Sequence, residues 1–241
     1  MYISETMERE LRAAADPKQR AVLMRFFKTA PGEYGEGDEF LGVRVPTTRA
    51  VVRDQWRDAT DGDVRRLTAS AFHEVRLAGF LTLINFYVRA RKNKDESEQH
   101  RLTDMYLSLR DRGNNWDLGD IVAPKILGDY LLRHPSEREV LYELAAMEGQ
   151  LWHQRVAMVS CWTMIRAGDF DDALRLAHLL MHHPHDLMHK ACGWQLREVG
   201  KRGGLNRLTD FLDAHAAEMP RTMLRYAIER LPESVRRHYM A

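Results

Sequence analysis

The repeating pattern of this chain is clearest around residues 114–128, which read NNWDLGDIVAPKILG. The stretch predicts a helix that begins after Asn114 or Asn115 as its N-cap and runs to Leu132, with a proline kink inside it. Trp116 and Asp120 are four residues apart and therefore lie on one face of that helix. Two interpretations are open: a half-buried helix with one solvated acid, or a helix that carries a functional site.

The same pattern recurs along the chain at a fixed interval. Four positions are each 35 residues apart: Asp120, Arg155, Lys190 and Arg225. Arg76 lies 44 residues before the first of them. A two-helix unit of this length is typical of helical solenoids. Apolar residues at helical spacing are frequent and alternating β-branched runs are missing, so the sequence predicts an all-α fold, an α-α superhelix that curves as a solenoid.

Turn residues divide this pattern into helices. Four helices are expected before residue 72. The first two are Ile3–Ala15 and Pro17–Lys28, the third is capped by Thr47 and runs to Arg57, and the fourth starts at Asp61 or Asp63 and runs to Ser70. The segment between the second and third contains four glycines and is expected to be a loop, Thr29–Val45. The later helices are expected at Phe72–Arg91, Glu98–Arg112, Asn115–Leu132, Ser136–Met147, Trp152–Ala167, Asp169–Met181, Leu187–Lys201, Leu205–Ala217 and Arg221–Leu231.

Composition places the chain among soluble globular proteins, with 44% apolar and 29% charged residues. No apolar run reaches the ~20 residues that a membrane span needs, and the charged N-terminus does not resemble a signal peptide. The two cysteines form no CxxC pair, which indicates buried thiols in a reducing cytoplasm. Net charge is +1, yet residues 187–241 hold ten Lys/Arg against six Asp/Glu, which permits an anionic ligand there.

The registered positions form a row that is basic except at Asp120. One interpretation is a groove for a phosphate backbone with one reactive carboxylate. The other is a structural ladder in which Arg155, Lys190 and Arg225 bridge helices or pair with Asp120. Trp194 follows Lys190 by four residues and shares its face, where a ring can stack on a base or sugar.

A histidine cluster is the other visible feature, comprising His178, His182, His183, His185 and His189. Two HxxxH spacings could hold a metal, but no carboxylate completes a hydrolytic zinc motif. The preferred interpretation is a polar turn beside a helix end, with no metal. The sequence also has no phosphate-binding glycine motif, no GxSxG and no Cys–His nucleophile pair.

Several motifs together resemble those of one family. They are His73–Ala78, Asn114–Gly128, Trp152–Arg155, His189–Glu198 and Met219–Glu229. The chain resembles, from about Leu23 onward, the bacterial DNA alkylation repair glycosylases of the AlkD type, which are built from HEAT-like repeats. The resemblance implies one HEAT-like repeat domain over residues 1–241, acting as a monomer on double-stranded DNA that carries alkylated bases.

The resemblance also implies site residues. Trp116 and Asp120 match the catalytic face, and Trp194 matches a second groove tryptophan. Phe26 matches a position that is commonly tyrosine, so it keeps a ring that can stack on DNA and lacks the hydroxyl. The basic residues expected to bind DNA phosphates are Arg155, Lys190, Arg197 and Arg225. Neither a metal nor an organic cofactor is expected.

The implied reaction is hydrolysis of the N-glycosidic bond of a cationic N3- or N7-alkylated purine. Asp120 would stabilise an oxocarbenium-like sugar and orient water. Two alternatives remain: a protein that binds DNA structure without cutting it, and a protein-interaction scaffold. The sequence does not indicate which alkyl groups are accepted or whether the base leaves the duplex stack.

Overall fold

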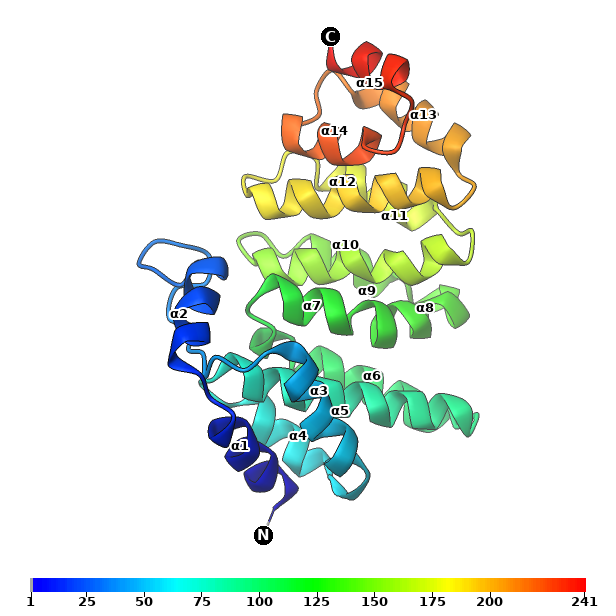
Figure 1. Ribbon diagram of the computed structural model, residues 1–241. Coiled ribbons are helices and arrows are strands. Elements are labelled where there is room, and N and C mark those ends of the chain that lie inside the picture. Colours follow the sequence, from blue (N-terminus) through cyan, green and yellow to red (C-terminus); the bar gives the residue numbers. More distant parts are fainter. Residues whose placement is uncertain (1) are drawn as a thin grey trace. The chain divides into compact units, whose positions relative to one another are not determined.

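The computed structural model describes residues 2–241, and its regular elements are helices joined by turns and loops (Figure 1). Within these residues there is no β-strand, only an isolated bridge between Glu39 and Phe72. The predicted all-α fold of paired helices is confirmed. None of the described helices is long and apolar enough to cross a membrane. The chain divides into two compact units, Met1–Leu118 and Gly119–Ala241.

The first unit is organised around one long buried helix. Its elements are α1 (Ile3–Ala13), α2 (Pro17–Phe26), α3 (Val45–Gln55), η1 (Trp56–Asp58), α4 (Asp61–Thr68), α5 (His73–Lys92), α6 (Glu96–Ser108) and η2 (Arg110–Arg112). Helix α5 packs against α3, α4 and α6. Its apolar residues surround the whole helix, which is why most of α5 is buried. Helix α2 is the opposite case, because none of its ten residues is buried.

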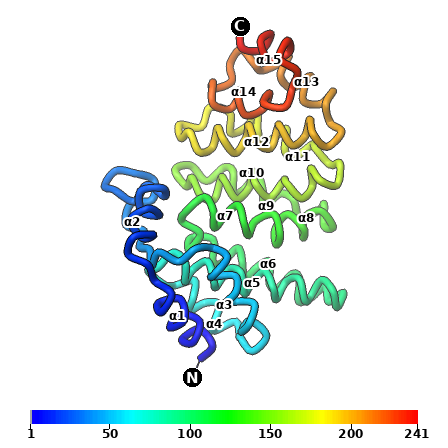
Figure 2. Tube along the Cα trace, viewed as in Figure 1, coloured from blue at the N-terminus to red at the C-terminus, as the bar shows by residue number. Residues whose placement is uncertain are grey.

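Helix α7 (Trp116–Val122) spans the boundary between the two units. The second unit continues with η3 (Pro124–Gly128), α8 (Asp129–Arg133), η4 (Pro135–Glu137), α9 (Glu139–Ala145), α10 (Leu151–Arg166), α11 (Asp171–Leu179), α12 (Asp186–Lys201), α13 (Leu205–His215), α14 (Arg221–Ile228) and α15 (Glu233–Met240). Helices α10, α12 and α14 lie side by side (Figure 2). They carry Arg155, Lys190 and Arg225, so the 35-residue register corresponds to successive helices of one stack.

The predicted helix from Asn115 to Leu132 is interrupted. Helix α7 ends at Val122 and is followed by a π-helical turn, η3, before α8 begins. The cause is Pro124, which has no N–H to donate and whose ring crowds the preceding turn. The N–H of Gly128 instead donates to the carbonyl of Ala123, 2.9 Å away, and the Thr163 hydroxyl donates to the carbonyl of Pro124.

Other helix ends also differ from the sequence prediction. Helix α3 begins at Val45 rather than at Thr47, because Pro46 is accommodated in the first helical turn, and Arg44 occupies the N-cap position. The helix expected from Ser136 begins as the short η4 and continues as α9. The amphipathic helix α15 was not predicted. The buried state of both cysteines is confirmed.

Gly193 allows α12 and α14 to pack closely. A Cβ atom at this position would lie 2.4 Å from the carbonyl oxygen of Met223 in α14. We therefore expect Gly193→Ala to lower the free energy of unfolding by about 1–3 kcal/mol, measured by urea denaturation. Gly119→Ala is the matched control, because its Cβ would meet only Val156, at an ordinary 3.7 Å. Equal stability of the two variants would contradict this account of the packing.

Candidate functional site

An aromatic cluster in the first unit contains two of the predicted site residues. The ring of Phe26, at the end of α2, lies edge-on to Trp116 with 5.9 Å between centroids. Phe26 is 59% exposed. The buried ring of Phe27 stacks on Trp116 at 5.4 Å with 27° between the planes. The structure therefore brings Phe26 and Trp116 together, and it places the buried ring of Phe27 beside them.

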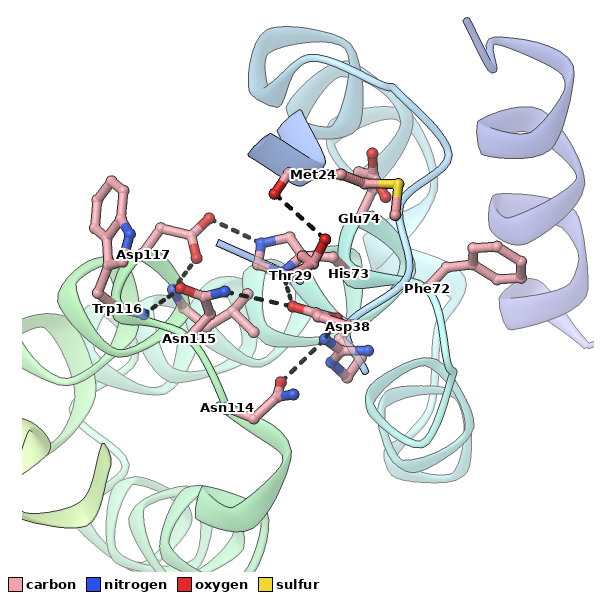
Figure 3. A network of polar contacts seen from close by, with 12 residues as sticks. Met24, Thr29, Asp38, Phe72, His73, Glu74, Asn114, Asn115, Trp116 and Asp117 are labelled. Carbon is pink, nitrogen blue, oxygen red and sulfur yellow. Dashed lines mark hydrogen bonds and ion pairs between the residues drawn. The ribbon is translucent and has the colours of Figure 1, made fainter. Parts of the chain in front are cut away.

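A charged histidine lies beneath this aromatic cluster. His73, the first residue of α5, contacts the rings of Phe27 and Phe40 at centroid distances of 5.0 and 4.6 Å. Its two ring nitrogens each lie 2.9 Å from a carboxylate, Asp38 on one side and Asp117 on the other (Figure 3). Burial opposes the charge, but hydrogen bonds and attraction from Asp117 and Asp38 outweigh it and raise the pKa of His73 to about 9. His73 is therefore an imidazolium at neutral pH.

The far side of Asp38 is held by Arg76. The guanidinium donates to Asp38, to the side-chain oxygen of Asn114 at 3.0 Å, and to the carbonyl of Ala71 at 2.8 Å. Burial opposes ionisation of Asp38, but His73 and Arg76 outweigh it and lower the pKa of that carboxyl. Arg76 opens the predicted basic row, yet its side chain is 6% exposed and is engaged within the first unit. It is not part of a surface track.

Two further side chains, those of Asn115 and Glu74, fix the backbone around this network. The side-chain oxygen of Asn115 accepts the N–H of Trp116 at 2.9 Å (Figure 3). Because α7 begins at Trp116, Asn115 lies at the predicted N-cap position, although this bond is to the adjacent residue. The carboxylate of Glu74 accepts backbone N–H groups from Leu41, Gly42 and Val43 at 2.8–3.0 Å. The loop before α3 is thus anchored to α5. The only sequence signal for this was a pair of polar residues, His-Glu, at the start of an apolar helix.

In the second unit, Asp120 and Arg155 form an ion pair. Arg155 Nε donates to one carboxylate oxygen of Asp120 at 2.9 Å, and Nη2 donates to the other at 2.8 Å. The side chains are 7% exposed for Arg155 and 18% for Asp120. Arg155 also donates to the carbonyl of Leu187. Pairing of Arg155 with Asp120, one of the two open interpretations, is the arrangement observed. Such a bidentate contact fixes both carboxylate oxygens in one orientation.

The other predicted phosphate-binding residues differ in availability. Lys190 pairs with Asp186 one turn earlier, at 2.7 Å. Arg197 is engaged by Glu229 and by Glu198. Arg225 is exposed on α14 and forms no ion pair with any of the described residues 2–241. Trp194, one turn after Lys190 on α12, is half-buried.

Three histidines of the cluster, His182, His183 and His185, line a cleft of about 790 Å³ beside the start of α12. His183 Nε2 lies 3.0 Å from the side-chain oxygen of Gln154. His185 Nδ1 accepts the N–H of Leu187 at 3.1 Å and so caps α12. Burial lowers the pKa of both histidines. Among the described residues, no three His, Cys, Asp or Glu side chains are arranged to hold a metal ion.

Comparisons with known proteins agree with this architecture. A family model described as DNA alkylation repair enzyme matches residues 7–231. One similar solved structure is described as a predicted DNA alkylation repair enzyme from Enterococcus faecalis. It has 14% sequence identity and a TM-score of 0.68, covering 91% of this chain and 97% of that chain, so it supports the fold alone. A search of the curated proteins found no match.

Proposed function

Since the chain belongs to the family of DNA alkylation repair enzymes, we propose that it is a glycosylase that releases N3- or N7-alkylated purines from duplex DNA. Membership of the family supports a role in the repair of alkylated DNA. The observation that carries the finer proposal is the Asp120 carboxylate, which lies on the same short helix as Trp116. Arg155, on α10, holds both of its oxygens. We further propose that the chain acts as a cytoplasmic monomer, as a single domain, without metal or organic cofactor.

Cleavage of this bond needs little help from a general acid, but it needs a carboxylate that stabilises the developing sugar cation. An alkylated purine carries positive charge, so it leaves readily with the bonding electron pair and becomes neutral. The barrier lies in the deoxyribose, which becomes oxocarbenium-like. A carboxylate with both oxygens already oriented stabilises that cation without reorganising, and it can direct water to the anomeric carbon. In this proposal Asp120 has that role, and Arg155 is the residue that orients it.

The proposed role of the two tryptophans is to enclose the cationic nucleotide. Trp116 and Trp194 would contact the deoxyribose and exclude bulk water, and aromatic faces attract a cationic base. Phe26 presents an exposed ring beside Trp116. Because phenylalanine has no hydroxyl, its proposed contribution is stacking alone.

The basic residues should contribute unequally to DNA binding, because some are already paired. We expect Arg225→Ala to weaken binding and to reduce the slope of log affinity against log salt by about one. Arg197→Ala should have a smaller effect, since DNA must compete with Glu229 for this guanidinium. Fluorescence anisotropy with a labelled duplex, at a series of salt concentrations, measures both slopes.

Arg133→Ala is the control for this comparison. Arg133 pairs with Asp129 within α8 and lies outside the registered row, so its loss should leave the slope unchanged. If binding by the unmodified protein does not weaken as salt rises, the row is not a phosphate track.

One observation favours a second candidate function. Phe26 lacks the hydroxyl that the matching position commonly carries, which would also suit a protein that binds altered DNA without cutting it. Incubation with methylated duplex DNA and chromatographic measurement of free bases distinguishes the two. Release of N3-methyladenine or N7-methylguanine supports the glycosylase. Salt-sensitive binding without base release supports the non-catalytic DNA binder. If the protein neither binds DNA nor releases a base, the protein-interaction scaffold is the remaining interpretation.

A further inference from the structure

Four buried groups in the first unit have balanced charges. His73 lies between Asp38 and Asp117, and Arg76 holds the other oxygen of Asp38. Their side chains are at most 9% exposed. Two carboxylates, one imidazolium and one guanidinium sum to zero. Loss of the His73 proton would leave one uncompensated negative charge in a site that water hardly reaches, which is costly.

The groups that face His73 come from three parts of the chain. Asp38 belongs to the loop before α3, Asp117 belongs to α7, and Arg76 lies behind Asp38 on α5 itself. The rings of Phe27 and Phe40 cover the imidazole. His73 and Arg76 are the two described cations that contact Asp38, and only His73 also contacts Asp117. The charge of His73 therefore adds to the contacts that hold these segments together.

Trp116 is connected to His73 by two routes. Asp117 directly follows Trp116 in the first turn of α7, and its second oxygen accepts the N–H of Leu118 at 2.8 Å. The Trp116 ring also stacks on Phe27, which packs on His73. Figure 3 shows Asp117 and Asn115 reaching from the start of α7 toward His73 and Asp38. A change at His73 therefore reaches both the backbone and the ring of Trp116.

We propose that His73 is a positioning residue, which holds the first turn of α7 through Asp117 and thereby sets the orientation of the Trp116 ring. Its consequence for catalysis rests on the proposed glycosylase function. While His73 is charged, Asp117 is held and Trp116 stays on Phe27. When His73 loses its proton, the imidazole keeps one N–H, so one of its two carboxylate contacts loses its hydrogen bond and both lose their charge. The hold on the first turn of α7 is then weaker, and the Trp116 ring changes its orientation.

Fluorine NMR of protein labelled with 5-fluorotryptophan tests the orientation directly. The chain has five tryptophans, and Trp116→Phe assigns the resonance of interest. We expect that resonance to shift with a midpoint near pH 9. In His73→Gln it should stay at its high-pH position and not titrate. In His73→Lys, which keeps a cation, it should stay near its low-pH position beyond pH 9.

Glu74→Gln is the matched control, because Glu74 neighbours His73 and anchors the same loop without contacting Asp117. Its Trp116 resonance should titrate as in the unmodified protein, although the variant is less stable. A resonance that ignores pH in the unmodified protein, or that titrates equally in His73→Gln, would overturn the proposal. If His73→Gln does not fold, the titration of the unmodified protein decides alone.

Base release under single-turnover conditions separates this proposal from the proposed function. Above pH 9 we expect the enzymatic rate to fall by about tenfold or more at saturating DNA, because a misplaced group slows the reaction itself. Titration of Trp116 without any base release would support the positioning role and contradict the glycosylase. Base release with no titration of Trp116 would support the glycosylase and contradict the positioning role.

Discussion

Replacing Asp120 by asparagine is expected to slow release of methylated purines by at least about 100-fold, the usual cost of losing one preorganised electrostatic contact. Asparagine keeps the shape of the side chain and loses the negative charge that would stabilise the developing sugar cation. DNA affinity should change little, because no phosphate contact is removed. Single-turnover release from methylated duplex DNA measures the rate, and anisotropy measures the affinity.

The variant also breaks an ion pair, so its stability must be measured alongside its activity. Arg155 is 7% exposed and would face a neutral amide. Losing one partner of a buried pair costs up to about 3–5 kcal/mol, and the partial exposure of Asp120 reduces that cost. Asp129→Asn is the control, since Asp129 pairs with Arg133 at 2.9 Å on α8. A folded Asp120→Asn variant with undiminished release would remove the carboxylate from the mechanism.

The stability of the first unit is expected to fall as pH rises from about 6.5 to about 9. The pKa of His73 is 6.5 when unfolded and about 9 when folded. Its contribution to the free energy of unfolding is therefore complete below pH 6.5 and lost as pH rises through 9. The difference between these pKa values corresponds to roughly 3 kcal/mol. The pKa of Asp38 is lowered in the folded protein, so its contribution to the free energy of unfolding is present at neutral and high pH and is lost only as pH falls into the acid range.

Urea denaturation of the unmodified protein and of His73→Gln at several pH values measures this contribution. The stability difference between the two should shrink by roughly 3 kcal/mol between pH 6 and pH 9.5. The difference between the unmodified protein and Glu74→Gln should stay constant over the same range, because the Glu74 contacts are backbone hydrogen bonds. A pH-independent difference for His73→Gln would show that the imidazole is neutral in the folded protein.

Local patterns in the sequence were sufficient to predict much of the architecture. Helical spacing and turn residues are short-range signals, so the helix pairs and the 35-residue register of Arg155, Lys190 and Arg225 could be read directly. Pro124 indicated a kink, but the π-helical form of that kink depends on which carbonyl the N–H of Gly128 reaches. Sequence spacing does not determine such a choice.

The candidate site was only partly predictable for a similar reason. The sequence left open whether Arg155 faces a phosphate or Asp120, because spacing gives the face of a helix and not the contact of a side chain. The contacts of His73 join a loop residue 35 positions before it to a helix residue 44 positions after it. Neither partner is one of the positions registered at the 35-residue interval. Spacing also did not separate the two adjacent rings at the end of α2, of which Phe26 is exposed and Phe27 is buried.

The exposed ring of Phe26 lies at the end of α2, a short helix with no buried residue. The helix has ten residues, none of them buried, and helices this short are marginal in water without tertiary packing. Its first turn is held by the Asp16 side chain, which accepts the N–H of Lys18 at 2.8 Å, and its end is held by Phe27. Between these two ends the helix gains little from burial. The position of the Phe26 ring therefore depends on the contacts at the ends of α2 rather than on packing along its length.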